Sequence, residues 1–145
     1  MALLGFLAIS QATHLLEHVA QMVQIHLLHL SGANAQGIVG QLNIEWVHFV
    51  WNALILVTLV VLVAHFRTNP WLIAVTPLAA WHFVEHSVMI ATYLQTGVSG
   101  SPGLLSSGGI VFGGLPIARP DLHFLYNLVE TVPLLLAWVV EIRRA

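Results

Sequence analysis

The amino-acid sequence predicts an all-α integral membrane protein, a four-helix transmembrane bundle that forms a single domain over residues 1–145. The chain is 58% apolar and only 7% charged, whereas ordinary globular domains are roughly 45–50% apolar and about 25% charged. Four stretches are apolar enough to cross a bilayer, which takes about 20 residues per helix. Two short motifs each occur twice in the same order, which predicts a bundle built from two parallel hairpin repeats.

The predicted spans are apolar segments separated by polar or glycine-containing connections. They cover approximately residues 2–30, 43–66, 71–96 and 122–142. The second span is the least ambiguous, because Thr58 is its only non-aliphatic residue between positions 54 and 64. The first span lacks a basic leader and is interrupted by polar residues, so we expect a membrane helix there and no cleavable signal peptide.

The arginines predict how the spans are oriented. Arginines in short loops are retained on the cytoplasmic side of a membrane. Arg67 lies between the second and third spans, and Arg143 and Arg144 follow the fourth, whereas the other connections carry Arg119 alone. We therefore expect both termini in the cytoplasm.

The connections differ in length and composition. Thr68, Asn69 and Pro70 supply a helix cap and a first-turn proline, which predicts a tight turn before the third span. The segment 97–118 carries seven glycines, and loops of this length are usually functional. We interpret it as a lid, a partner-binding surface or a plain connector.

The first and third spans share one motif, and the second and fourth share another. The motif HxxEH occurs at residues 14–18 and 82–86, and HF followed by an aliphatic residue, an aromatic residue and Asn occurs at residues 48–52 and 123–127. We interpret the chain as a duplicated hairpin, with repeat 1 over about residues 1–67 and repeat 2 over about residues 68–145. Each copy crosses the membrane twice, so the two copies have the same orientation and a pseudo-twofold axis along the membrane normal is predicted.

The polar residues of the spans are expected to face one another. A charged group at the bilayer centre costs at least about 2.5–3.5 kcal/mol, so polar stripes on membrane helices turn away from lipid. Glu130 breaks the duplication, since Ile55 stands at the equivalent position of the second span. Counting along the helices places the polar residues in the outer half of the bilayer, in one cluster.

Histidines four residues apart project from one helix face and can chelate one ion. The candidate metal ligands are His14, Glu17, His18, His48, His82, Glu85, His86 and His123. This is the composition of a two-metal site in a helical bundle, with iron, copper, zinc or manganese as candidates and about two ions per chain. Glu17, Glu85 and Glu130 are the candidate catalytic acids or bases, and Asn52 and Asn127 the candidate residues that orient the imidazoles or act as weak ligands.

Other interpretations of the same residues stay open. Buried His, Asn and Glu can hydrogen-bond between helices without any ion, they can form a proton relay, and a pair of histidines can ligate haem. His26, His29 and His65 lie nearer the ends of the spans and are expected to be interfacial polar residues.

The leading functional hypothesis is a metal-dependent oxidoreductase that carries out dioxygen-linked chemistry on a membrane-soluble substrate. The alternatives are a metal-ion carrier or sensor, a haem-binding membrane protein, and an accessory subunit of a larger membrane complex; a homo-oligomer is a further option. Four arginines and no lysine argue against nucleic-acid binding. The absence of cysteine excludes disulfides, thiolate metal sites and cysteine nucleophiles.

Overall fold

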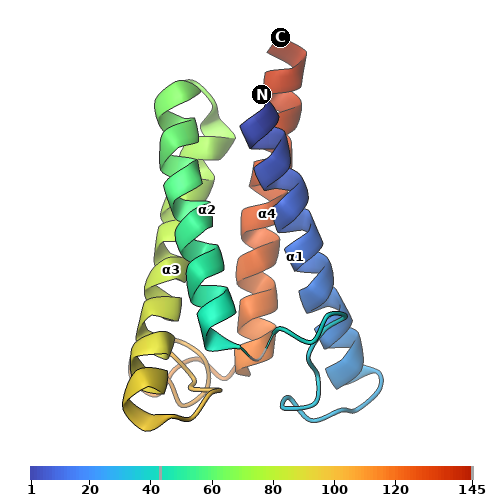
Figure 1. Cartoon of the computed structure of the whole chain (residues 1–145), viewed down its shortest axis with the longest axis vertical. Helices are drawn as coiled ribbons and strands as arrows, with labels where there is room; N and C mark the ends of the chain where they lie inside the picture. Colours follow the sequence, from blue (N-terminus) through green and yellow to red (C-terminus); the bar gives the residue numbers. More distant parts are fainter. Residues whose placement is uncertain (43, 145) are drawn as a thin grey trace.

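The computed structural model describes residues 1–42 and 44–144, which form an all-helical bundle (Figure 1). The described residues contain four helices: α1 (Ala2–His26), α2 (Glu45–His65), α3 (Pro70–Thr96) and α4 (Arg119–Arg144). No strand occurs in this part of the chain. The helices match the predicted spans within a few residues, except that α1 ends at His26 although the apolar sequence continues to Leu30. Position 43, the predicted start of the second span, lies outside the described residues.

Three helices among the described residues, α2, α3 and α4, are long and apolar enough to cross a membrane. The sequence predicted a fourth such helix, but α1 is not among them despite its 25 residues. Its buried positions explain the difference, because they include the polar residues Gln11, His14, Glu17, His18 and Gln21.

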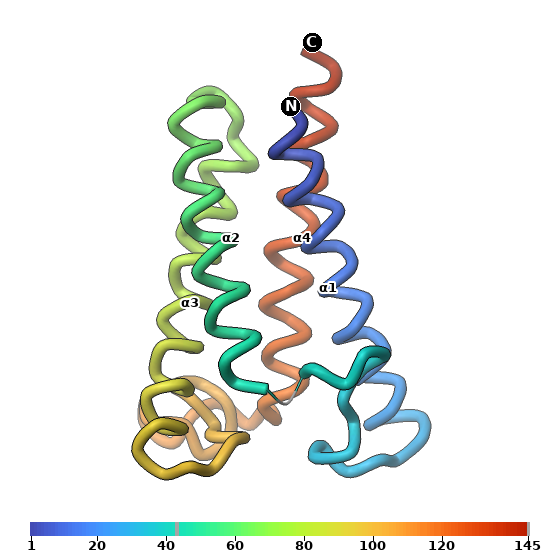
Figure 2. Tube along the Cα trace, in the orientation of Figure 1, coloured from blue at the N-terminus to red at the C-terminus, as the bar shows by residue number. Residues whose placement is uncertain are grey.

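Both long connections lie at one end of the bundle, which we call the loop end (Figure 2). The two termini and the short turn between α2 and α3 lie at the opposite end. The turn contains the predicted cap: the Asn69 side chain accepts hydrogen bonds from the backbone N–H groups of Trp71 and Leu72, at 3.1 and 3.3 Å, and Pro70 begins α3. The Asn69 amide also donates to Glu141 Oε1 at 2.8 Å, which ties this turn to α4.

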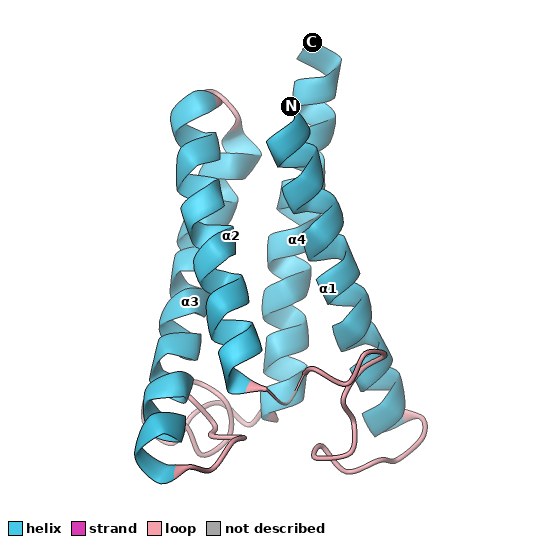
Figure 3. Ribbon diagram, viewed as in Figure 1, coloured by secondary structure: helices cyan, strands magenta, loops and turns pink. Residues whose placement is uncertain are grey.

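The helices pack in an order that leaves one pair loosely joined. Helix α2 packs against α3, α1 packs against α4, and α3 packs against α4 (Figure 3). Helices α1 and α2 contact each other far less than these pairs do. The bundle is therefore closed along α3 and α4 and more open along α1 and α2.

An apolar core fills the half of the bundle near the termini. Its fully buried members include Leu4, Leu59, Leu72 and Leu134. Large apolar side chains are exposed on the outer surface of the bundle. Phe6 is 70% exposed and Val57 is 64% exposed. Many buried side chains toward the loop end are polar, whereas many large apolar side chains lie on the outer surface.

Candidate metal centre

Six buried histidines from all four helices gather in the half of the bundle near the loop end. They form two groups of three among the described residues: His14, His18 and His48, and His82, His86 and His123. We call these the first triad and the second triad. Within each triad, one ring nitrogen of each histidine lies within 4.8 Å of the others. Each triad could hold a metal ion, as the paired motifs indicated.

The two triads touch each other. The His48 ring of the first triad stacks on the His86 ring of the second, with centroids 5.2 Å apart and planes 15° apart. Within the second triad, the His86 and His123 centroids are 4.8 Å apart. Within the first, the His14 and His48 centroids are 5.5 Å apart. The six rings therefore form one continuous cluster that links all four helices.

One histidine of each triad is oriented by a backbone carbonyl one turn earlier in its own helix. His48 Nδ1 lies 3.3 Å from the Ile44 carbonyl oxygen, and His123 Nδ1 lies 2.8 Å from that of Arg119. A carbonyl oxygen only accepts hydrogen bonds, so Nδ1 carries the proton and Nε2 carries the lone pair. This hydrogen bond is the usual way in which a protein presents imidazole Nε2 to a metal.

The two predicted asparagines make matching contacts one turn further along. Asn52 Nδ2 donates to the His48 carbonyl and Asn127 Nδ2 donates to the His123 carbonyl, both at 2.9 Å. These contacts are to the histidine backbone, not to the imidazole ring. Their role in orienting the rings stays a prediction.

Glu130 holds one histidine of the second triad. His82 Nδ1 lies 2.9 Å from Glu130 Oε1, and both side chains are buried. The carboxylate accepts this proton, so His82 Nε2 carries a lone pair, and it lies 3.0 Å from His86 Nε2. Gln11 of α1 reaches the same carboxylate, with Nε2 3.5 Å from Glu130 Oε2 and 3.0 Å from Asn127 Oδ1.

Several buried polar atoms of the cluster lack a hydrogen-bond partner among the described residues. They are His14 Nε2, His18 Nδ1 and Nε2, His86 Nδ1, His123 Nε2 and Glu85 Oε2. Leaving one buried polar group unsatisfied costs about 1–3 kcal/mol. Six such atoms together would offset a large part of the roughly 5–15 kcal/mol that stabilises a typical domain. Water molecules or a bound ion would supply the missing partners of these atoms.

The glutamates of the two HxxEH motifs contact the long loops. Glu17 Oε2 accepts hydrogen bonds from the backbone N–H groups of residues 38 and 39, at 2.7 and 3.1 Å. Glu85 Oε1 accepts from those of residues 104 and 105, at 2.8 and 3.3 Å. Neither carboxylate belongs to a triad. Their assignment as metal ligands and as catalytic groups stays a prediction, and the contacts observed fix the loops over the cluster.

A glycine with positive φ lies against each of these carboxylates. Gly37 has φ 78° and Gly103 has φ 68°, values that L side chains rarely adopt. A Cβ atom added to either glycine would collide with the facing carboxylate, Glu17 in one case and Glu85 in the other. Glycine is therefore required at positions 37 and 103, where the loop backbone approaches Glu17 and Glu85.

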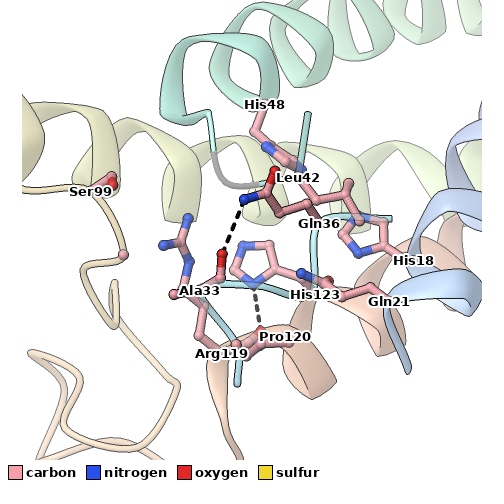
Figure 4. Close-up of a pocket in the computed structure, with 12 residues that line it drawn as sticks. His18, Gln21, Ala33, Gln36, Leu42, His48, Ser99, Arg119, Pro120 and His123 are labelled. Atoms are coloured by element: carbon pink, nitrogen blue, oxygen red, sulfur yellow. Dashed lines mark hydrogen bonds between the residues drawn. The ribbon is translucent and has the colours of Figure 1, made fainter. Parts of the chain in front are cut away.

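A cavity of about 370 Å³ leads from the loop end to the cluster. Three triad histidines, His18, His48 and His123, line it together with the loops (Figure 4). Arg119 also lines it and forms an ion pair with Glu45, at 2.9 Å. The cavity brings both triads within reach of small polar solutes.

The remaining histidines lie apart from the cluster. His26 Nε2 lies 2.6 Å from Asp121 Oδ1, so it joins the end of α1 to the first turn of α4. The His65 ring contacts the Phe66 ring at 4.5 Å, at the far end of α2. His29 follows α1 and has φ 54°. None of the three belongs to a triad, and their interfacial position stays a prediction.

Four further residues contribute to the site and were not predicted from the sequence to do so. Trp51 and Tyr126 lie on the rings of His14 and His82, with centroids 5.3 and 4.8 Å away. Their equivalent positions in the second motif were a signal for this shared role. Gln11 and Arg119 were visible only as polar residues, because their partners lie on other helices.

The donor set fits a transition metal. Three nitrogens bound to one ion at about 2.0–2.1 Å in a tetrahedral site lie roughly 3.4 Å apart, so nitrogens spaced within 4.8 Å of one another would have to move together by about 1 Å. Neutral imidazoles suit zinc, copper, iron and nickel. Four triad histidines, His14, His18, His86 and His123, offer such an ion a ring nitrogen that has no partner among the described residues.

Similarity to known proteins does not bear on this assignment. No protein-family model, curated protein or solved structure matches the chain.

Proposed function

We propose that this chain is an integral membrane metalloprotein whose two histidine triads hold two transition-metal ions. The single observation that carries the proposal is the set of buried imidazole nitrogens without a partner in the described protein. If the histidines served only to join helices, their nitrogens would be paired with one another. One imidazole pair is hydrogen-bonded, His86 with His82, while nitrogens of His14, His18 and His123 are left over.

We further propose that the centre performs redox chemistry on a membrane-soluble substrate, with dioxygen as the electron acceptor. When bound, the two ions would supply sites for electron transfer and for dioxygen. The protein contributes imidazoles whose orientation is fixed. The Nδ1 protons of His48, His123 and His82 are held by the Ile44 carbonyl, the Arg119 carbonyl and the Glu130 carboxylate, respectively. Glu85 Oε2 is buried and unpartnered, so Glu85 is the proposed proton acceptor.

The metal content of the purified protein tests this proposal. The chain should be produced in membranes, extracted into a mild detergent, and analysed for bound metals together with its absorption spectrum. We expect about two ions per chain, and a loss of at least one ion in H14A and in H86A. His65→Ala is the matched control, because His65 lies outside both triads. Full metal retention in both triad variants, or a haem spectrum in place of bound ions, would overturn the proposal.

A metal-ion carrier or sensor is the second candidate, and the cavity at the loop end favours it. This cavity gives ions a polar route to His18, His48 and His123. A carrier also needs a polar route to the other face, whereas the half of the bundle near the termini is filled by an apolar core that includes Leu59 and Leu134. Metal uptake into proteoliposomes that contain the purified chain separates the candidates, since only a carrier would move ions across the bilayer.

A further inference from the structure

A groove between α1 and α2 reaches the first triad from the side of the bundle. It has a volume of about 430 Å³, in the range of small-molecule sites. Its apolar walls include Phe6, Ile9, Val47 and Trp51, and His14 lines it as well. The groove is separate from the cavity at the loop end, which is lined by His18, His48 and His123.

The groove opens on the apolar outer surface of the bundle. Phe6 is 70% exposed and Ile9 is 56% exposed, so the rim of the groove consists of side chains suited to lipid. His14, in contrast, is 5% exposed, and its Nε2 has no hydrogen-bond partner among the described residues. A molecule in the groove would therefore pass from an apolar rim to a polar ring nitrogen or to an ion held there.

The face between α3 and α4, which corresponds to the groove between α1 and α2, is closed. Helices α3 and α4 pack directly against each other, and Trp81 Nε1 donates to the Tyr126 hydroxyl at 3.0 Å across them. Tyr126 in turn covers His82, with ring centroids 4.8 Å apart. At the matching position of the first hairpin, Trp51 lies on His14 and forms a wall of the groove. The opening is therefore specific to the first triad.

We infer that this groove binds a membrane-soluble molecule that has an apolar body and one hydroxyl group, such as an alkylphenol, with the hydroxyl group toward His14. The flat indole of Trp51 suits an aromatic ring, because aromatic pairs are stabilised beyond the area they bury. Ser10 and Thr13 supply polar side chains to the same groove. The inference rests on the proposed function and deepens it, because it names the substrate class and the triad that receives it.

A photoreactive alkylphenol tests the inference. The probe carries a diazirine in its alkyl tail, and a matched probe lacks the hydroxyl group. Both are added to the whole chain, loaded with metal, in lipid nanodiscs, and the crosslinked positions are mapped by mass spectrometry. We expect the phenol to label α1 and α2 around Ile9 and Val47, and the matched probe to label them much less.

Two variants that fill the groove serve as the direct test. Ile9→Trp places a large side chain from α1 into the groove, and Val47→Trp does so from α2. We expect either change to lower labelling by about tenfold, as an overpacked site excludes its ligand. Ile73→Trp is the matched control, because Ile73 is 52% exposed on α3 and does not line the groove. Labelling of Ile73→Trp should equal that of the unchanged chain.

The outcomes separate this inference from the proposed function. Equal labelling by the two probes would mean that the groove does not recognise the hydroxyl group, and it would overturn the inference. Labelling that neither tryptophan variant lowers would overturn it as well. Metal content is measured on the same samples: labelling confined to the groove in a chain that binds no metal would support the groove and refute the metal centre. Normal metal content with labelling scattered over the chain would support the metal centre and refute the groove.

Discussion

Replacing Glu130 should weaken one metal position and leave the other unchanged. Glu130 Oε1 accepts a hydrogen bond from His82 Nδ1 at 2.9 Å, and the two side chains are 2% and 0% exposed. A hydrogen bond to a charged group contributes about 1.5–3 kcal/mol, which corresponds to roughly 10- to 150-fold in affinity. Loss of such a partner of a ligating histidine typically costs about 10- to 100-fold in metal affinity. The first triad has no equivalent carboxylate, because Ile55 occupies the matching position.

The assay is a stepwise titration of the metal-free protein with Co²⁺ or Zn²⁺ in competition with a chelator. Glu130→Gln keeps the shape and can still accept the His82 proton, so we expect about a tenfold loss at one site, toward the low end of the range. Glu130→Ala removes the acceptor and should approach 100-fold. Glu141→Gln, at the far end of the same helix, is the control, since Glu141 contacts Asn69 and Arg144. Equal weakening of both sites, or no change in either, would refute the assignment of Glu130 to the second triad.

Three further outcomes are expected. Gly103→Ala should destabilise the protein by about 1–3 kcal/mol, since positive φ is strained for alanine and its Cβ would displace the Glu85 carboxylate; Gly97→Ala, also at positive φ but with no atom in the way, should cost less, and thermal unfolding in detergent compares them. Metal retention should fall in acid, at a pH below that at which a free imidazole titrates, because protons compete with metal for the buried imidazole nitrogens; ions that stay bound in acid until the helices unfold would contradict ligation by histidine. A C-terminal reporter should be active in the cytoplasm, whereas access only from outside the cell would reverse the orientation that the arginines predict.

The sequence was sufficient to place the helices and the histidine cluster. Hydropathy locates α2 because its core from position 54 to 64 is almost wholly aliphatic. The cluster followed from a physical constraint: polar groups in apolar helices turn toward each other, and repeated motifs bring equivalent residues to similar depth. The rings of His14, His48, His123 and His82 accordingly follow one another in contact although they lie on four different helices.

The end of the first helix could not be predicted in the same way. Residues 27–30 are Leu, Leu, His and Leu, and such a short apolar run does not distinguish helix from other backbone conformations. Helix α1 ends at His26, the residue that pairs with Asp121 of α4. That contact joins residues 95 positions apart, so it depends on the tertiary packing and has no local signal.

The contacts of Glu17 and Glu85 with the loops could not be predicted from the sequence either. The position of Glu17 and Glu85 between histidines indicated a role at the metals, yet each accepts hydrogen bonds from the backbone of a loop that follows its helix. This contact depends on Gly37 and Gly103 adopting positive φ beside the carboxylates. Many glycines in the loops have positive φ, so the sequence alone does not identify the two that matter.

Gln11 and Glu130, two buried polar residues, belong to one connected set of side chains. Trp51, a wall of the groove, donates from Nε1 to Gln11 Oε1 at 3.2 Å. Gln11 Nε2 lies 3.5 Å from Glu130 Oε2, and Glu130 holds His82 of the second triad. At the matching positions relative to the repeated motifs, the chain has Ala79 in place of Gln11 and Ile55 in place of Glu130. Two buried side chains, Gln11 and Glu130, therefore connect this wall of the groove to His82 of the second triad.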